Sequence, residues 1–330
     1  MRLLPRPNGA PAAAALYLSG TAPFRCAPSV AGVTLDGVDV GVGLASPQAS
    51  CDATQPFAFN LRVDAPPGAT WVVGQVYHVR VYAADTGALL AFHLLDAGAN
   101  ADSAPAPESG FWWSEAGADA GPASPGTGIS LERQGGQLAV GLFGFTDSGA
   151  ATWQFGSAAL GGRALSVPLV QLANGDPMFS PTGSQPVPQN GPRLEIEFVS
   201  PTRARAYLVH VEDGRDVDVR ALRLSRTPFA SGPAGSAWAG QWVLVPDDGG
   251  APRLFEFAEP SSQGAENFHL TDLGNDASLD CRLAAGSSQP DACTLSVAAA
   301  TLADFDAIGL DGLSGHGRGG ATVKLLRVAR

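Results

Sequence analysis

The sequence predicts an all-β protein: an N-terminal β-sandwich, a central antiparallel meander or barrel, and a small C-terminal β region with one short helix. The first observation behind this class is that apolar and polar residues alternate along most of the chain, as in Phe57–Val63. Successive side chains of a strand face opposite sides, so this alternation indicates half-buried strands. The second is that 41 glycines and 26 prolines separate these runs, as turns between strands require.

The composition and charge of the chain limit the classes of partner that it can bind. At 330 residues the chain is long for one domain, and 45% hydrophobic residues suffice for several cores. Charged residues make up only 15%, against about a quarter in an average protein. A net charge of −11 with a single lysine, Lys324, argues against nucleic acid, whose binding needs clustered cations. No apolar run has the length of a membrane-spanning helix. A surface finished with small neutral residues suits an exported protein, in the periplasm, at the cell surface or secreted.

The expected boundaries follow composition. The regions are 1–19 as a disordered segment or signal remnant, 20–97 as the sandwich, 98–109 as a linker, 110–228 as the central domain, 229–237 as a second linker and 238–330 as the C-terminal domain. In the first region the apolar stretch Ala12–Leu18 follows arginines but is short and preceded by prolines, which makes a poor signal peptide. In the sandwich, Val76–Tyr82 and Leu89–Leu95 flank Asp85-Thr86-Gly87, which predicts a hairpin.

Two local irregularities carry predictions in the later regions. Apolar residues in Val217–Leu224 change from odd to even positions, which predicts a β-bulge near Ala221. In Ser296–Ile308 the spacing of Leu302 and Phe305 fits one face of a helix, and this is where we expect the short helix.

The four cysteines form two local pairs, Cys26 with Cys51 and Cys281 with Cys293. Four cysteines allow three pairings, and the local one is favoured because each pair lies near one end of the chain. We expect disulfides, as in exported proteins, with buried free thiols as the alternative. No Cys-x-x-Cys motif or suitably placed histidine indicates zinc.

The central region contains more specific motifs. They are Gly110-Phe111-Trp112-Trp113, then Gly126-Thr127-Gly128 leading to Leu131 and Gln134-Gly135, then Phe143-Gly144-Phe145-Thr146-Asp147-Ser148-Gly149 and Trp153. Their order resembles an uncharacterised family of exported proteobacterial proteins whose repeating unit opens with Gly-x-Trp-Trp. The resemblance covers residues 109–227. Ser114-Glu115 stands where that family has Asn-Pro, and Leu142 where it has Trp. The resemblance implies an exported antiparallel sheet protein and brings no activity with it.

An aromatic group in this region is the candidate ligand-binding site. Its members are Trp112, Trp113, Phe143, Phe145 and Trp153. Adjacent residues of a strand face opposite sides, so one of Trp112 and Trp113 can lie in the core and the other outside. An exposed indole beside other aromatics can stack on sugar rings. The alternative is that most of these side chains are core residues, since aromatics dominate sheet interiors.

The sequence shows no catalytic constellation. Gly315–Gly320 spells a dinucleotide fingerprint but lacks the helix that such a site needs after it, so we expect a loop there. The five histidines are scattered, and we expect neither metal nor cofactor. We therefore expect a non-enzymatic exported protein that binds a small molecule, glycan or protein through its central domain. The alternatives are a secreted hydrolase acting on polysaccharide or peptidoglycan, and a cell-surface assembly module.

Overall fold

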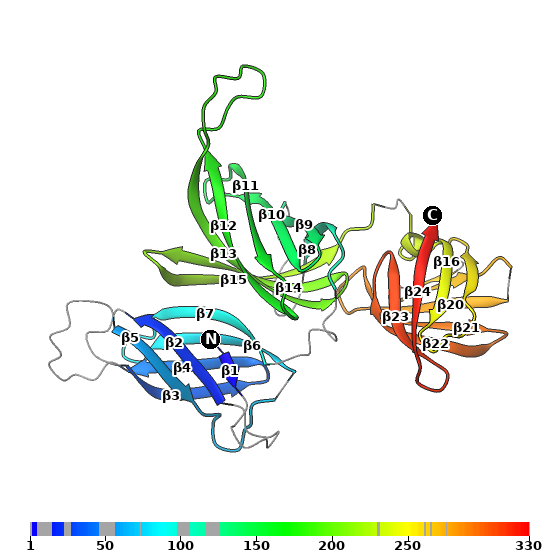
Figure 1. Ribbon diagram of the computed structural model, residues 1–330, viewed down its shortest axis with the longest axis horizontal. Coiled ribbons are helices and arrows are strands. Elements are labelled where there is room, and N and C mark those ends of the chain that lie inside the picture. The colour runs from blue at the N-terminus through cyan, green and yellow to red at the C-terminus, as the bar shows by residue number, and fades with distance from the viewer. Residues whose placement is uncertain are drawn as a thin grey trace.

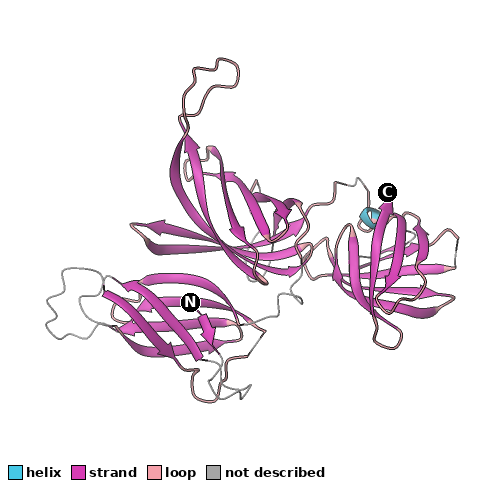
Figure 2. Ribbon diagram, in the orientation of Figure 1, coloured by secondary structure: helices cyan, strands magenta, loops and turns pink. Residues whose placement is uncertain are grey.

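The computed structural model describes residues 2–4, 15–22, 28–45, 57–72, 74–97, 106–116, 126–229, 232–260, 262–264, 266–274 and 276–329. Three β-sheet units follow one another along the chain and lie side by side (Figure 1). The helix in the described part is a single 3-10 turn, η2 (Ser236–Trp238), just before the last unit (Figure 2). The all-β class predicted from the alternating pattern is confirmed.

The N-terminal unit is a sandwich of two sheets. The first sheet has the order β1-β2-β5, made of β1 (Arg2–Leu4), β2 (Ala15–Ala22) and β5 (Phe57–Val63). The second has the order β3-β4-β6-β7, made of β3 (Ser29–Asp36), β4 (Asp39–Ala45), β6 (Val76–Ala83) and β7 (Leu89–Asp96). Leu16 and Leu18 of one sheet and Val40 and Val42 of the other share one buried core. The predicted sandwich is therefore present.

The chain order within this sandwich differs in part from the prediction. The hairpin predicted from Asp85-Thr86-Gly87 is confirmed as β6 and β7. However, β4 and β6 pair in parallel, because the chain crosses to the other sheet as β5 between them. The end of the segment 1–19, expected to be disordered or a signal remnant, lies in the central strand β2, so that boundary was wrong for residues 15–19. Cys26 and Cys51 lie outside the described residues.

The central unit is a closed eight-stranded barrel. Each strand pairs antiparallel with the next, and β15 returns to pair with β8. The strands are β8 (Gly110–Glu115), β9 (Gly128–Gln134), β10 (Gln137–Phe145), β11 (Ala151–Ala159), β12 (Ala164–Ala173), β13 (Val187–Ser200), β14 (Arg203–Glu212) and β15 (Arg215–Arg226). The interior is filled by side chains, among them Trp112, Ile129, Val140, Ile196 and Phe198. These side chains pack inside the barrel, so the exposed side chains of its strands lie on the outside.

The irregularity predicted near Ala221 has a different cause. In β15 the register shifts between the pairs His210–Asp218 and Val211–Asp216, so the bulged residue is Val217. The apolar phase change at Ala221 needs no bulge, because both faces of this strand are covered. Leu222 and Leu224 point into the barrel, whereas Val219 and Ala221 pack outward against the aromatic cluster of Phe92 and Tyr207. The prediction of a bulge near Ala221 was therefore wrong.

The C-terminal unit is a nine-stranded antiparallel sheet that nearly closes on itself. Its order is β17-β16-β24-β23-β22-β21-β20-β19-β18, with β16 (Gly240–Pro246), β17 (Arg253–Phe257), β18 (Ser262–Gln263), β19 (Asn267–Thr271), β20 (Ala277–Leu283), β21 (Pro290–Val297), β22 (Ala300–Ile308), β23 (Gly312–Gly317) and β24 (Thr322–Ala329). A bridge between Phe257 and Asp272 joins the two ends of the sheet. Cys281 and Cys293 face each other on β20 and β21 and form the predicted disulfide inside the core.

The helix expected at Ser296–Ile308 is not formed, and this prediction was wrong. The segment contains the end of β21, a turn at Ala298 and Ala299 with φ of 49° and 61°, and β22. A register shift between the pairs Leu295–Ala303 and Ser296–Thr301 leaves Leu302 unpaired on β22, and Leu302 packs against the same core as Phe305 although the two are three positions apart. This bulge reproduces the spacing of a helix within a strand. The loop expected at Gly315–Gly320 is present only in its second half: Gly315, His316 and Gly317 lie in β23, and residues 318–320 form the turn before β24. The prediction was therefore wrong for the first three residues.

Candidate functional site

An aromatic face covers the outside of the barrel over β8 to β11. We define it as Phe111, Trp113, Phe143, Phe145, Trp153 and Phe155. Pairing aligns Trp113, Gly128, Phe143 and Trp153 in one row across the four strands. The next row runs from Phe111 through Ser130 and Gly141 to Phe155. The exposed fraction of Trp113, Phe143, Phe145, Trp153 and Phe155 lies between 38% and 58%.

The rings contact one another along and across the strands. The ring centroids of Phe111 lie 5.8 Å from those of Trp113 and 5.6 Å from those of Phe143, with interplanar angles of 26° and 27°. Trp153 and Phe155 form a similar pair at 6.0 Å and 26°. Near-parallel neighbouring rings make an extended apolar surface, which on a monomeric soluble protein often marks a binding site.

Glycines let the rings lie close to the sheet. A Cβ atom placed on Gly128 would come 2.6 Å from Cε3 of Trp113, so the indole lies across this glycine. A Cβ on Gly126 would meet the ring of Phe145 in the same way. Side chains laid over glycine cover the bare backbone and turn their other face outward, so the face offers ring planes and not only ring edges.

Trp112 does not belong to this face. Its exposed fraction is 0%, it packs in the barrel core against Phe198, and its indole N–H donates to the carbonyl of Glu108 at 3.1 Å. The expectation that adjacent tryptophans face opposite sides is met, and it removes Trp112 from the candidate ligand-binding residues. The other four candidates all lie on the face. Sequence reasoning missed Phe111 and Phe155, although each stands two positions from a recognised member, on the same side of its strand.

A groove continues the face at its β8 edge. It has a volume of about 470 Å³ and is lined by Phe111, Trp113 and Glu115 of β8, by residues 225–229 and by Ser288. Phe229 is 75% exposed at its rim. The groove therefore places the rings of Phe111 and Trp113 near Ser288 of the C-terminal unit.

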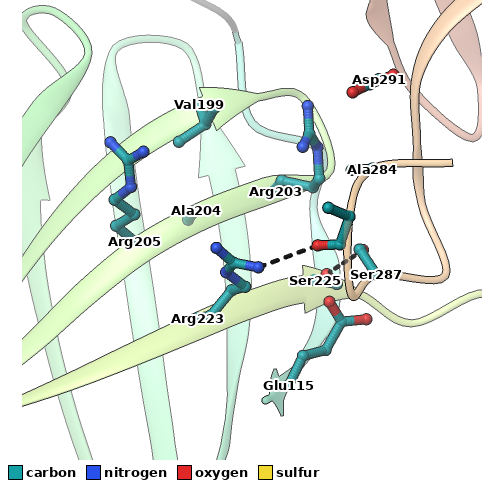
Figure 3. A pocket seen from close by; sticks show the side chains of 11 residues that line it. Glu115, Val199, Arg203, Ala204, Arg205, Arg223, Ser225, Ala284, Ser287 and Asp291 are labelled. Carbon is teal, nitrogen blue, oxygen red and sulfur yellow. Dashed lines mark hydrogen bonds between the residues drawn. The ribbon is translucent and has the colours of Figure 1, made fainter. Parts of the chain in front are cut away.

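An arginine cavity lies beyond Glu115, where β14 and β15 meet the turn between β20 and β21 (Figure 3). Its volume is about 200 Å³, and its charged lining consists of Glu115, Arg203, Arg205, Arg223 and Asp291. Arg205 and Arg223 are paired directly across the two strands, and Arg203 stands two positions before Arg205 on β14. Glu115 and Ser225 line both the cavity and the groove, so the two are adjacent.

A buried ionic cluster joins the opposite side of the barrel to the sandwich. Arg193 donates to both oxygens of Asp216 at 2.9 and 2.6 Å and to Glu195 at 2.8 Å. Asp216 also accepts the backbone N–H of Phe92 at 2.7 Å, and Glu195 lies 3.2 Å from His93. Because each of these charges has an oppositely charged or hydrogen-bonding partner across the contact, this cluster fixes two units together.

A histidine, a carboxylate and a hydroxyl meet at the same contact. The two ring nitrogens of His78 lie 3.3 Å from Glu197 and 3.1 Å from the hydroxyl of Tyr207. These three residue types serve acid–base catalysis elsewhere, but here they are only 5%, 3% and 6% exposed. Burial raises the pKa of Tyr207 well above its ordinary value, so the phenol keeps its proton. His78 is thus a structural histidine with its hydrogen bonds satisfied.

The comparisons with other proteins add no identification. No family model matches the chain, and no curated protein matches it. The resemblance of residues 109–227 to an exported family therefore stays a prediction. Within the described ranges, no three His, Cys, Asp or Glu side chains are grouped so that they could hold a metal ion. No helix in these ranges is long and apolar enough to cross a bilayer.

Proposed function

We propose that this chain is a non-enzymatic binding protein whose aromatic face stacks against the sugar rings of a glycan. The observation that supports the proposal is the double row of partly exposed rings on the outside of a barrel whose interior is filled. The apolar C–H side of a sugar ring fits against an aromatic plane, which is the element this face repeats. The outward positions between the rings are Gly128, Ser130 and Gly141, small residues that leave room for a ligand.

A protein partner is the competing occupant of the same face. The described outward positions between the rings, Gly128, Ser130 and Gly141, include neither methionine nor arginine, the residues that are enriched together with aromatics at protein interfaces. We therefore favour the glycan. We also propose that the protein is exported, which the Cys281–Cys293 disulfide supports because disulfides persist in oxidising compartments.

Tryptophan fluorescence gives a direct test of the aromatic face. Of the six tryptophans, Trp71, Trp112, Trp238 and Trp242 are at most 3% exposed, so changes on ligand addition report on Trp113 and Trp153. The full chain is titrated with soluble cello-, chito- and mannan-oligosaccharides and incubated with cellulose, chitin and peptidoglycan sacculi. We expect a saturable fluorescence change or pull-down with at least one of these.

Substitutions then assign the binding to the face. Each of Trp113→Ala and Trp153→Ala removes a stacked ring, worth on the order of 1 kcal/mol, and should weaken binding roughly 5- to 10-fold. The matched control is Phe179→Ala, which removes a 95% exposed ring from the long β12–β13 loop, and it should bind as the wild type does. The proposal is contradicted if the wild type binds neither the soluble oligosaccharides nor the insoluble polysaccharides. It is also contradicted if all variants bind as tightly as the wild type. Concentration-dependent self-association abolished by the same two variants would assign the face to a protein interface.

A glycan hydrolase is the second candidate, because two carboxyl groups, Glu115 and Asp291, line the arginine cavity. The cavity is smaller than the 300 Å³ or more of typical ligand pockets, which favours binding of one substituent over enclosure of a glycosidic bond. Release of reducing ends from any bound polysaccharide, abolished by Glu115→Gln, would establish hydrolysis. The binding proposal expects no release.

A further inference from the structure

The arginine cavity holds a buried hydrogen-bond donor that the protein leaves unused. Nε of Arg203 is inaccessible to solvent and has no acceptor among the described residues. Burial, together with the neighbouring charges of Arg223 and Arg205, lowers the pKa of Arg203. A buried, charged donor without an acceptor is costly and calls for an explanation such as an ordered water, an ion or a functional role. Because Nε itself is inaccessible, an occupant of the cavity would bind the terminal nitrogens of this guanidinium group.

The same cavity holds a buried acceptor without a donor. Oε2 of Glu115 is inaccessible and has no described donor, whereas Oε1 is within reach of Ser288, at 3.5 Å from its N–H and 3.3 Å from its hydroxyl. A simple anion such as chloride or sulfate would satisfy Arg203 but not this oxygen. An occupant that satisfies both offers an acceptor to Arg203 and a donor to Glu115. A water molecule does so, and so does an oxyanion substituent with a hydroxyl group beside it.

The remaining charges of the cavity have known engagements. Arg223 donates to the carbonyl of Ala285 at 3.1 Å, the contact drawn in Figure 3. Arg205 reaches Glu197 at 3.3 Å, and Asp291 accepts from Arg282 at 3.0 Å, outside the cavity. Arg205 and Asp291 are thus each paired with a residue outside the lining, which leaves the guanidinium groups of Arg203 and Arg223 facing the carboxylate of Glu115. This is a local excess of positive charge in a chain whose net charge is −11.

The cavity is placed to receive a substituent of whatever lies on the aromatic face. Phe111 and Trp113 line the groove together with Glu115 and Ser225, and these last two residues also line the cavity. Glu115 and Trp113 stand two positions apart on β8, on the same side of the strand, about 7 Å along it. This is the scale of one sugar residue. The cavity volume of about 200 Å³ suits a charged substituent with its neighbouring hydroxyl.

We propose that the ligand is an anionic glycan, in which one sugar stacks on Trp113 and Phe111 while an oxyanion substituent binds Arg203 and an adjacent hydroxyl donates to Glu115. The proposal rests on the proposed glycan-binding function and deepens it. The oxyanion is the carboxylate of a uronic acid or a sulfate ester, since both present acceptors that a guanidinium group binds in the same way.

The test compares charged with neutral ligands on the full chain. Affinities are measured by calorimetry for oligogalacturonate, for a sulfated galactan oligosaccharide and for neutral galactan oligosaccharides of equal length. We expect one of the two anionic ligands to bind at least 10-fold more tightly than the neutral one, and the better of them identifies the substituent. Arg203→Gln should abolish this preference while leaving neutral binding within about twofold.

The matched control is Arg220→Gln, the same substitution at an exposed arginine of β15 that does not line the cavity, and it should keep the preference. If Arg203→Gln does not fold, competition on the wild type replaces it: galacturonic acid should displace the ligand and galactose should not. Equal affinity for charged and neutral glycans, or equal competition, overturns this inference alone. Absence of binding to every glycan overturns the proposed function as well. Loss of neutral binding in Trp113→Ala with the anionic preference intact separates the two parts of the site.

Discussion

The two junctions of the barrel differ in how completely their buried polar groups are paired. Toward the sandwich, Arg193, Glu195 and Asp216 are buried and bound to one another or to the backbone across the contact. Toward the C-terminal unit, buried polar atoms of Glu115, Arg203 and Gln289 have no partner among the described residues. On the sandwich side, one buried side-chain atom of the described residues, Nε of Arg163, also has no partner.

The difference fits a structural role for the first junction and the binding role that we propose for the second. A satisfied buried cluster holds two units in one geometry, because removal of any member strands another charge. An unsatisfied cluster beside a cavity leaves interaction free energy for an incoming molecule. Charge content alone does not distinguish them, since both junctions draw on carboxylates and arginines of strands β13 to β15.

The largest effect should come from breaking the sandwich junction. Asp216→Ala leaves Arg193 and the backbone N–H of Phe92 without their acceptor, so we expect a loss of about 3–5 kcal/mol in unfolding free energy. Urea unfolding followed by circular dichroism measures it. Asp218→Ala, an exposed neighbour on the same strand, should change stability by less than about 0.5 kcal/mol. Equal effects of the two variants would show that the junction charges are solvated.

A smaller loss should follow reduction of the disulfide. Cys281 and Cys293 close a loop with a sequence separation of 12, and such a cross-link stabilises by about 3 kcal/mol. Dithiothreitol, or the paired substitution of both cysteines by serine, should lower the unfolding free energy of the C-terminal unit by this amount. Hydrogen exchange should show faster exchange in β20 and β21 and unchanged exchange in β6 and β7. Loosening of both regions would mean that the junctions are energetically coupled.

The smallest effect is a difference in pH dependence between the junctions. Burial disfavours ionised Glu197, but the hydrogen bond from His78 and the charge of Arg205 outweigh it, so its pKa is lowered. Its stabilisation is complete above the unfolded pKa near 4.5 and is lost as the pH falls below that value. Burial raises the pKa of Glu108, despite backbone bonds from Asp311 and Leu310. Its charge therefore costs stability at neutral pH, and this cost disappears as the pH falls through the raised pKa.

Two variants turn this difference into a measurement. Between pH 7 and pH 4, the advantage of the wild type over Glu197→Gln should shrink, whereas its stability relative to Glu108→Gln should rise. Urea unfolding at four pH values gives both slopes. Slopes of the same sign would contradict the contrast between the junctions.

The fold was predictable because its signals are local. Alternation identified the strands, and turns such as Asp213-Gly214, with φ of 49° and 75°, declare themselves by residue type. The errors arose where a strand departs from simple alternation. A bulge imitated helical spacing at Leu302 and Phe305, and contact on both faces imitated a bulge at Ala221. In both cases the residues that form the contact are not adjacent in the sequence, so the local pattern does not reveal them.

The candidate site was also predictable only in part. Trp113, Phe143, Phe145 and Trp153 were found because they cluster on consecutive strands, and only the pairing register shows that they form rows with Phe111 and Phe155. The arginine cavity could not be found from sequence. Its residues come from β8, β14, β15 and the segment between β20 and β21, which are far apart in sequence.

Closure of the barrel also bears on the order in which the site assembles. Strands β8 to β11 are successive hairpins, so the rings can come together from contacts that are short in sequence and fast to form. The pairing of Trp112 with Arg226 joins the first strand of the barrel to the last. It closes the longest loop in this unit and therefore has the largest entropic cost. Glu115 and Arg223 meet only through that pairing. In a refolding chain, the aromatic face would thus form before the arginine cavity, because Glu115 and Arg223 come together only when β8 pairs with β15.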